Sequence, residues 1–242
     1  MSALTWIEIF MNTNTRESID DLIVATRILV NEQVIDGFGH ASVRDPSRLD
    51  RYFMTRDNFG GTDGEDYIIE LDLDSNPCKP NGPKPSLERF IHGEIYRARP
   101  DVNAIVHTHS PALIPFGVSK TLLQPLYHMC GFLAAGAPVF DIQHKHGMTN
   151  MLIQSSKLGR SLASSLGKSA VVLMRGHGAT IVGSSMKEAV FRGVYTTINA
   201  RLQPIAMQLG DPKFLDHEEA VKTDELHHAV LDRPWDYWKS RL

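Results

Sequence analysis

The sequence predicts an α/β fold with a mixed central sheet flanked by helices. Short apolar segments typical of strands alternate along the chain with longer segments whose apolar residues recur at helical spacing. Three strand-like segments follow one another early in the chain, which favours a mixed sheet over a purely parallel one. The 242 residues contain no low-complexity linker, so we expect one domain over residues 1–242.

The first half of the chain alternates predicted helices with the early strands. Helical periodicity runs from Ser18 to Val34, and the glycines at 37 and 39 are expected to end that helix. Pro85 and Ser86 are expected to open a second helix that continues to about Ala98, with Glu88 in its first turn, where the helix dipole favours an acid. Turns rich in Asp, Gly and Asn separate the predicted strands, which are 40–44, 52–55 and 67–73.

The second half adds a central strand, a pair of strands, two long helices and an aromatic tail. We expect strands at 103–106, 170–174 and 180–182, and helices at 150–166 and 185–209. The tail, residues 213–242, carries Trp235, Tyr237 and Trp238. Such an aromatic cluster is consistent with contact to a neighbouring subunit and equally with packing inside the chain.

His107 and His109 end the apolar segment 102–106 and are separated by one residue. Alternate side chains of a strand share a face, so both imidazoles can point at one ion while Thr108 points away. Imidazole binds zinc, iron and manganese, and a usable site needs further ligands from elsewhere in the chain. A polar strand edge has the same spacing, so the pair alone leaves both interpretations open.

Glu88 and His177 are the candidates for the missing ligands. Glycines on both sides of His177 remove side chains that would crowd its approach to a neighbouring strand. Each residue also has a simpler interpretation, since Glu88 could cap a helix and His177 could be an ordinary turn residue.

Glu88, the segment 99–110 (RPDVNAIVHTHS) and the segment 175–178 (RGHG) together resemble the class II aldolase/adducin family, over roughly residues 20–208. In that family three histidines and a glutamate surround a divalent metal, and adducin-like scaffolds have generally lost these ligands. The resemblance implies a single-domain class II aldolase-like fold and an enzyme, a metal-dependent carbon–carbon lyase. It implies His107, His109 and His177 as metal ligands and Glu88 as a fourth ligand or an acid/base catalyst. The implied ion is Mn²⁺ or Zn²⁺, with Fe²⁺ possible, and the implied assembly is a homotetramer with active sites at subunit boundaries.

Several positions differ from the phosphate-binding residues of the sugar-phosphate aldolases in this family. His40 replaces an asparagine, Asp57 adds an acid to a turn, and the hydroxyl pair before Glu88 is reduced to Ser86. A phosphate dianion needs N–H groups and hydroxyls close around it, so these changes favour a carboxylate or phenolate on a flatter substrate. The candidate substrate-binding residues are His40, Ser42, Arg44, Arg56, Lys84 and Ser86.

His128 stands where the aldolases have a proton-donating tyrosine, so His128 or Glu88 is the expected proton donor. The wider pattern resembles the branch typified by 3-hydroxy-2-methylpyridine-4,5-dicarboxylate 4-decarboxylase of vitamin B6 breakdown. This resemblance implies decarboxylation of a hydroxylated aromatic or pyridine dicarboxylic acid, within aromatic acid catabolism. Two alternatives stay open, namely a sugar-phosphate aldolase or epimerase similar to fuculose-phosphate aldolase, and a non-haem iron oxygenase on the same fold.

Composition excludes several other classes of protein. The net charge is −3 with both signs interspersed, which leaves no basic stripe for nucleic acid. Cys78 and Cys130 lie in unrelated contexts, which indicates a reducing compartment. The N-terminus lacks a signal sequence and no segment reaches the ~18 apolar residues of a membrane span. We therefore expect a cytoplasmic protein that binds a small carboxylic acid, with no nucleic-acid or membrane partner.

Overall fold

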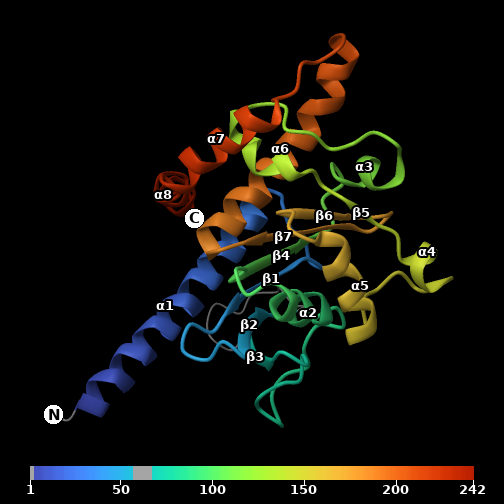
Figure 1. The fold of residues 1–242 in the computed structure, drawn as a ribbon. Helices are drawn as coiled ribbons and strands as arrows, with labels where there is room; N and C mark the ends of the chain where they lie inside the picture. The colour runs from blue at the N-terminus through green and yellow to red at the C-terminus, as the bar shows by residue number, and fades with distance from the viewer. Residues whose placement is uncertain (1–2, 57–66) are drawn as a thin grey trace.

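The computed structural model describes residues 3–56 and 67–242, with side chains from Thr13 onward. One seven-stranded sheet in the order β3-β2-β1-β4-β7-β6-β5 forms its centre (Figure 1). Neighbouring strands are antiparallel except β5 and β6, which are parallel, so the predicted mixed sheet is confirmed. The strands are β1 (His40–Arg44), β2 (Arg51–Thr55), β3 (Ile68–Asp72), β4 (Ala104–Thr108), β5 (Val139–Phe140), β6 (Val171–Met174) and β7 (Gly178–Gly183).

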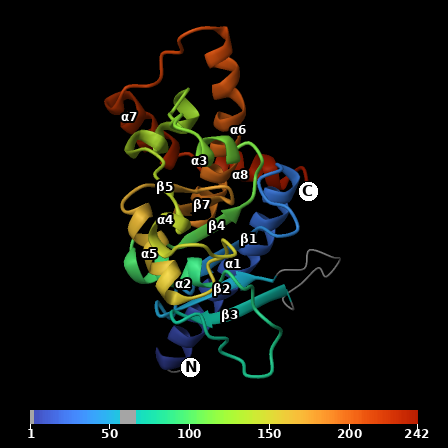
Figure 2. The ribbon, with the colours of Figure 1, turned by 90° about the vertical axis from the view of Figure 1, so that its right-hand side faces the viewer.

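Helices cover both faces of the sheet (Figures 1 and 2). The helices are α1 (Ala3–Asn31), α2 (Phe90–Ala98), α3 (Ile114–Val118), α4 (Ile142–His146), α5 (Ser156–Leu166), α6 (Met186–Leu209), α7 (His217–His228) and α8 (Asp232–Lys239), with a 3₁₀ segment η2 (His128–Ala135). Helices α1 and α6 bury their apolar side chains in one core, and α2 and α5 bury theirs in the core on the opposite face. No helix in the described part of the chain is long and apolar enough to cross a membrane.

The alternation of side chains along β4 decides which face receives the histidines. Ala104 and Val106 belong to the core under α1 and α6, whereas Ile105 belongs to the core under α2 and α5. His107 therefore faces the α2 side of the sheet. Its antiparallel partner in β1 is His40, so the His40 side chain emerges on the same face.

The first helix is longer at its start than its periodicity predicts, and it stops earlier. It begins at Ala3 rather than Ser18 and ends at Asn31. Gln33 adopts a left-handed conformation (φ 57°), while the N–H of Val34 bonds to the carbonyl of Leu29. This is the Schellman arrangement, so Gln33 and not the later glycine pair terminates the helix.

Two other predicted helices begin later than expected. Helix α2 starts at Phe90, so Glu88 lies in the preceding turn instead of the first helical turn. Helix α5 starts at Ser156, where the Ser155 side chain caps it, and residues 150–155 run as an irregular segment. Both corrections concern segments that contact the candidate site.

The aromatic tail packs largely within its own chain. Trp235 and Trp238 are buried in the core that α1 and α6 share, and Trp238 packs against Tyr195 with ring centroids 6.0 Å apart. Tyr237 is exposed. Intrachain packing therefore accounts for both tryptophans.

Candidate metal centre

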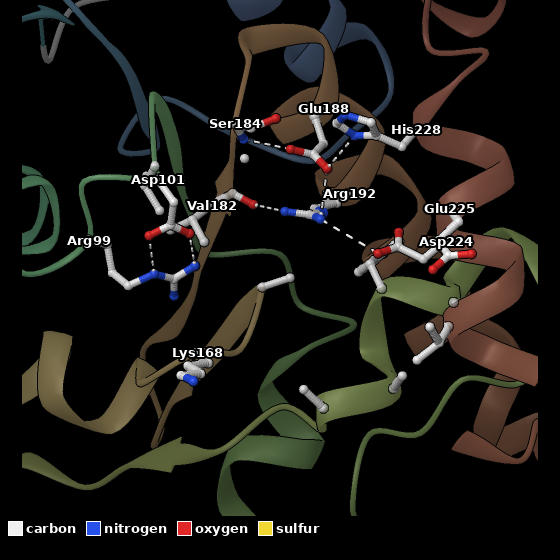
Figure 3. Close-up of a pocket in the computed structure, with 18 of the residues that line it drawn as sticks. Arg99, Asp101, Lys168, Val182, Ser184, Glu188, Arg192, Asp224, Glu225 and His228 are labelled. Atoms are coloured by element: carbon white, nitrogen blue, oxygen red, sulfur yellow. Dashed lines mark hydrogen bonds and ion pairs between the residues drawn. The ribbon is translucent and has the colours of Figure 1, made fainter. Parts of the chain in front are cut away.

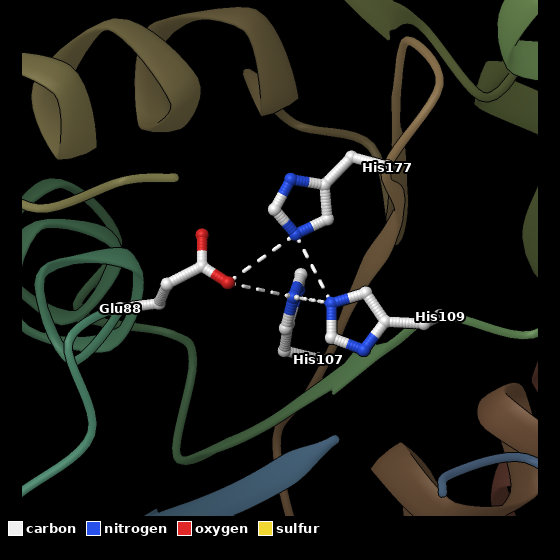
Figure 4. A group of neighbouring side chains, drawn as sticks. All are labelled: Glu88, His107, His109 and His177. Carbon is white, nitrogen blue, oxygen red and sulfur yellow. Dashed lines mark hydrogen bonds and ion pairs between the residues drawn. The ribbon is translucent and has the colours of Figure 1, made fainter. Parts of the chain in front are cut away.

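Glu88, His107, His109 and His177 form a compact group whose ligand atoms all lie within 4.8 Å of one another (Figure 4). The Nε2 atom of His109 lies 3.2 Å from Nε2 of His107 and 3.1 Å from Nε2 of His177. Oε2 of Glu88 lies 3.5 Å from Nε2 of His107 and 3.2 Å from Nε2 of His177. Three nitrogens and one oxygen thus surround a common point, which is the donor set of a four-coordinate metal site.

The β4 and β7 strands place the three imidazoles by approaching each other very closely. His107 lies near the end of β4 and His109 follows the strand, while His177 lies in the turn between β6 and β7. A Cβ added at Gly178 would lie 2.0 Å from the carbonyl oxygen of Thr108, so this position requires glycine. Gly176 adopts φ 62°, which lets the turn return directly to the strand.

Glu88 is held by backbone contacts on both sides. The backbone N–H of Glu88 donates to Oγ of Ser86 at 3.3 Å, and its carbonyl accepts from Ile91 at the start of α2. Oε1 accepts from the backbone N–H of Ile153 at 2.8 Å. The other carboxylate oxygen is therefore left to face the histidines.

Two of the histidines have a partner for their second nitrogen. Nδ1 of His177 donates to the carbonyl of Met151 at 3.1 Å, and Nδ1 of His107 lies 3.3 Å from Oγ1 of Thr180. With a cation bound, such contacts would hold the tautomer in which Nε2 is the ligand atom. The irregular segment before α5 thereby orients both His177 and, through Ile153, Glu88.

The protonation of the group suits a cation. Burial raises the pKa of Glu88, but hydrogen bonds from His107 and His177 outweigh this effect and hold the pKa well below its ordinary value. Burial lowers the pKa of His109 to about 4, and it also lowers that of His107. Burial lowers the pKa of His177 as well, but the hydrogen bond with Glu88 more than offsets this, and the net shift is upward. Near neutral pH the centre therefore combines a carboxylate with two neutral imidazoles, while His177 holds any remaining proton.

Residues 20–203 match the model of the class II aldolase and adducin N-terminal domain family. The chain belongs to the class II aldolase/adducin family. It is 36% identical to a protein named decarboxylase tropJ from Talaromyces stipitatus, over 94% of this chain and 95% of the relative. It is 29% identical to a 3,4-dihydroxyphthalate decarboxylase from Arthrobacter keyseri, over 78% of this chain and 77% of that one. The fold matches that of L-fuculose 1-phosphate aldolase from Glaciozyma antarctica, with a TM-score of 0.76 and 20% identity over 95% of this chain and 90% of that one.

Arg44 and Ser42, predicted as substrate contacts of this class II aldolase/adducin protein, instead serve the core. The guanidinium of Arg44 donates to the backbone carbonyls of Leu49, Tyr96, Arg99 and Val102, at 2.8 to 3.2 Å. Ser42 is fully buried and bonds His92 and Tyr96. β1 turns both side chains under α2, where neighbouring groups occupy their polar atoms.

The other predicted substrate contacts have mixed positions. His40 is buried beside the centre, with its ring centroid 4.9 Å from that of His107. Ser86 is buried two residues before Glu88, and Lys84 is exposed. Asp57 lies outside the described residues.

His128 does not join the four residues within one chain. It begins η2, and its ring lies against His227, with centroids 5.5 Å apart, and against Tyr127 at 6.0 Å. Gly131, Phe132, Ala134 and Ala135 of η2 line a cavity at the other end of β7, beside Gly183. The predicted role of His128 as proton donor to its own chain's centre is therefore not supported by its position.

This cavity, of about 580 Å³, is lined by charged residues that mostly pair with each other (Figure 3). Glu188 bonds Arg192 at 2.7 Å and His228 at 3.2 Å, and Arg99 bonds Asp101 at 2.6 Å. The Glu188–His228 pair ties the end of α7 to the start of α6. We assign the cavity no function.

Sequence reasoning missed four contributors to the centre. Met151 and Ile153 act through backbone atoms, for which no side-chain pattern exists. His92 and Tyr96 lie behind His40, and their spacing of four residues on α2 was the available signal, since it places both on one helical face.

Proposed function

We propose that this protein is a metal-dependent decarboxylase of a hydroxylated aromatic acid that carries its hydroxyl next to the carboxylate. The observation that supports this most strongly is the Glu88, His107, His109 and His177 group, found in a chain that aligns almost end to end with a protein named as a decarboxylase. The relative from Arthrobacter keyseri is named for 3,4-dihydroxyphthalate, a benzene dicarboxylate. A benzene ring is therefore the first substrate to test, ahead of the pyridine dicarboxylate.

The residues present fit a divalent cation. Three imidazole nitrogens and a carboxylate oxygen converge from three separate segments, and two of the imidazoles have low pKa values that keep their lone pairs available. Zn²⁺, Mn²⁺ and Fe²⁺ all accept this donor set. A cation held here would stabilise the negative charge that carbon dioxide leaves on the ring and its oxygen.

The side chains of the protein must also supply the proton that replaces carbon dioxide on the ring. Glu88 stays ionised because its pKa is far below neutrality, which favours a ligand role over a proton-donor role. The proton that replaces carbon dioxide on the ring must then come from another group. We propose that His128 supplies it from a second copy of the chain, which requires the expected oligomer with sites at subunit boundaries.

Mixing two inactive variants tests the role of His128. Oligomers that contain both His109→Ala and His128→Ala chains should regain part of the activity, because some sites then combine an intact His109 with an intact His128. His144→Ala, on the exposed helix α4, is the matched control and should leave activity unchanged. Mixed oligomers that stay as inactive as either parent would contradict a shared site.

The function itself is tested by carbon dioxide release. Purified protein is stripped of metal, reloaded separately with Zn²⁺, Mn²⁺ or Fe²⁺, and incubated with 3,4-dihydroxyphthalate and other ortho-hydroxy aromatic acids. We expect release that depends on the metal and stops in His109→Ala. Cleavage of fuculose phosphate would favour the aldolase alternative instead, and oxygen consumption with Fe²⁺ would favour the oxygenase.

A further inference from the structure

Four buried polar side chains form a continuous hydrogen-bonded chain beneath α2. The Tyr96 hydroxyl lies 2.8 Å from Oγ of Ser42, Oγ of Ser42 lies 2.6 Å from Nδ1 of His92, and Nε2 of His92 lies 2.8 Å from Nδ1 of His40. Each of the four residues is at most 1% exposed. The chain ends at His40, which lies opposite His107 in the β1–β4 ladder.

The groups at the two ends of this hydrogen-bonded series determine which residue donates and which accepts in each of its hydrogen bonds. If Tyr96 donates to Ser42, Ser42 to His92, and His92 to His40, the one unmatched group is the Nε2–H of His40. In the reverse direction two groups are unmatched. Nε2 of His40 is then bare, and the Tyr96 hydroxyl has no acceptor other than Ser42 in residues 13–56 and 67–242. Unmatched buried polar groups are unfavourable, so the direction from Tyr96 to His40 is preferred.

We propose that Tyr96, Ser42 and His92 are positioning residues that fix His40 as its Nε2–H tautomer, and that this N–H donates to an anionic oxygen of the bound aromatic acid. Such a contact would give a partner to a buried ring nitrogen beside the candidate metal centre that has none among residues 13–56 and 67–242. Nε2 of His40 is closed to water in this structure. Its acceptor therefore arrives with a ligand that displaces the covering side chains.

The carboxylate that remains on the ring is the acceptor that fits the chemistry. A donor placed on the departing carboxylate would retain the charge that must move into the ring, whereas a donor on the remaining carboxylate positions the substrate without this cost. A charged acceptor also forms the stronger hydrogen bond. The identity of this ligand rests on the proposed function, but the tautomer of His40 does not.

Nitrogen NMR on metal-free protein labelled with ¹⁵N-histidine tests the tautomer, because protonated and bare ring nitrogens resonate far apart. Solid-state spectra suit an oligomer of any size, and a His40→Asn sample assigns the His40 signals. We expect a protonated Nε2 and a bare Nδ1 at His40, and a mixture of both tautomers in Ser42→Ala. The opposite tautomer in the unsubstituted protein would overturn the proposal.

Ser75→Ala is the matched control for Ser42→Ala. Ser75 belongs to a second buried Tyr–Ser pair in the same layer, in which the Tyr52 hydroxyl donates to Oγ of Ser75 at 3.0 Å. In the described part of the chain this pair makes no hydrogen bond to His40 or His92. Ser75→Ala should therefore leave the His40 tautomer unchanged, and a change equal to that in Ser42→Ala would indicate a general packing effect and overturn the assignment.

Binding of two product-like probes to metal-loaded protein tests the ligand. 3,4-Dihydroxybenzoate carries the ring carboxylate, and catechol lacks it. His40→Phe should weaken 3,4-dihydroxybenzoate binding on the order of 10-fold or more, as expected for a lost hydrogen bond to a charged group, while catechol binding changes less than about twofold. Equal losses for both probes, at unchanged metal content, would show that His40 only supports the fold, and no loss for either would exclude a contact. Neither result depends on turnover.

Discussion

Replacing Gly178 by alanine tests whether the metal centre depends on the close approach of β4 and β7. The new Cβ would lie 2.0 Å from the carbonyl oxygen of Thr108 and 3.1 Å from Cα of His109, whereas real Cβ contacts essentially never fall below 3.0 Å. The two strands must therefore separate by about 1 Å locally. His177 directly precedes residue 178, and His109 directly follows Thr108, which the new Cβ displaces. Both proposed ligands therefore move.

The expected loss has two parts. Overpacking of this kind costs about 1–3 kcal/mol, which corresponds to a fall in Tm of roughly 2–12 °C for a chain of this length. Metal–ligand distances tolerate only about ±0.2 Å, so a shift of about 1 Å should weaken metal binding on the order of 100-fold or more. The loss of affinity should therefore exceed what the loss of stability alone would cause.

Calorimetric titration of the metal-stripped protein with Zn²⁺ or Mn²⁺ measures the affinity, and thermal unfolding measures Tm. Gly37→Ala is the control, because a Cβ at Gly37 meets no atom of the described residues within 4 Å and its backbone has no positive φ. It should resemble the unsubstituted protein in both assays. A Gly178→Ala protein with unchanged metal affinity and unchanged Tm would refute the reasoning.

Three further predictions follow from the geometry. His109→Ala should lose bound metal and carbon dioxide release together, as measured by metal analysis and gas evolution, and unchanged turnover would contradict the proposed centre. Arg44→Met removes the guanidinium donor from four backbone carbonyls, two of them in buried hydrogen bonds, so urea unfolding should show a loss of about 2–5 kcal/mol, with KM nearly unchanged in the folded fraction. The pKa of His177 is raised above 6.5, so metal affinity measured on both sides of this pH should fall about tenfold per unit below that raised pKa, as protons compete with the ion. In metal-free protein the Glu88–His177 pair has the opposite dependence, since its stabilisation is complete below pH 6.5 and is lost as pH rises through the raised pKa.

The sequence alone determined the ligand types and the pairing of His107 with His109, because the two-residue period of a strand is a local property. It also located the strands at His40–Arg44 and Arg51–Thr55 to within a residue, because their turn residues and apolar patterns are local signals. The conspicuous glycines around His177 likewise marked a close approach of two backbones. Each of these features is visible within about ten residues of chain.

Only the tertiary structure decided which polar residues serve the site and which serve the core. Arg44 and Ser42 look like substrate contacts in the sequence, but the pairing of β1 with β4 turns them under α2, where backbone carbonyls and buried hydroxyls bind them. The carbonyl of Met151 and the N–H of Ile153 contact the centre from an irregular segment. The apolar periodicity of the sequence had predicted a helix there. The amino-acid sequence determines which side chains are available as ligands. Long-range packing determines the surroundings of each side chain, and these surroundings set its charge and its tautomer.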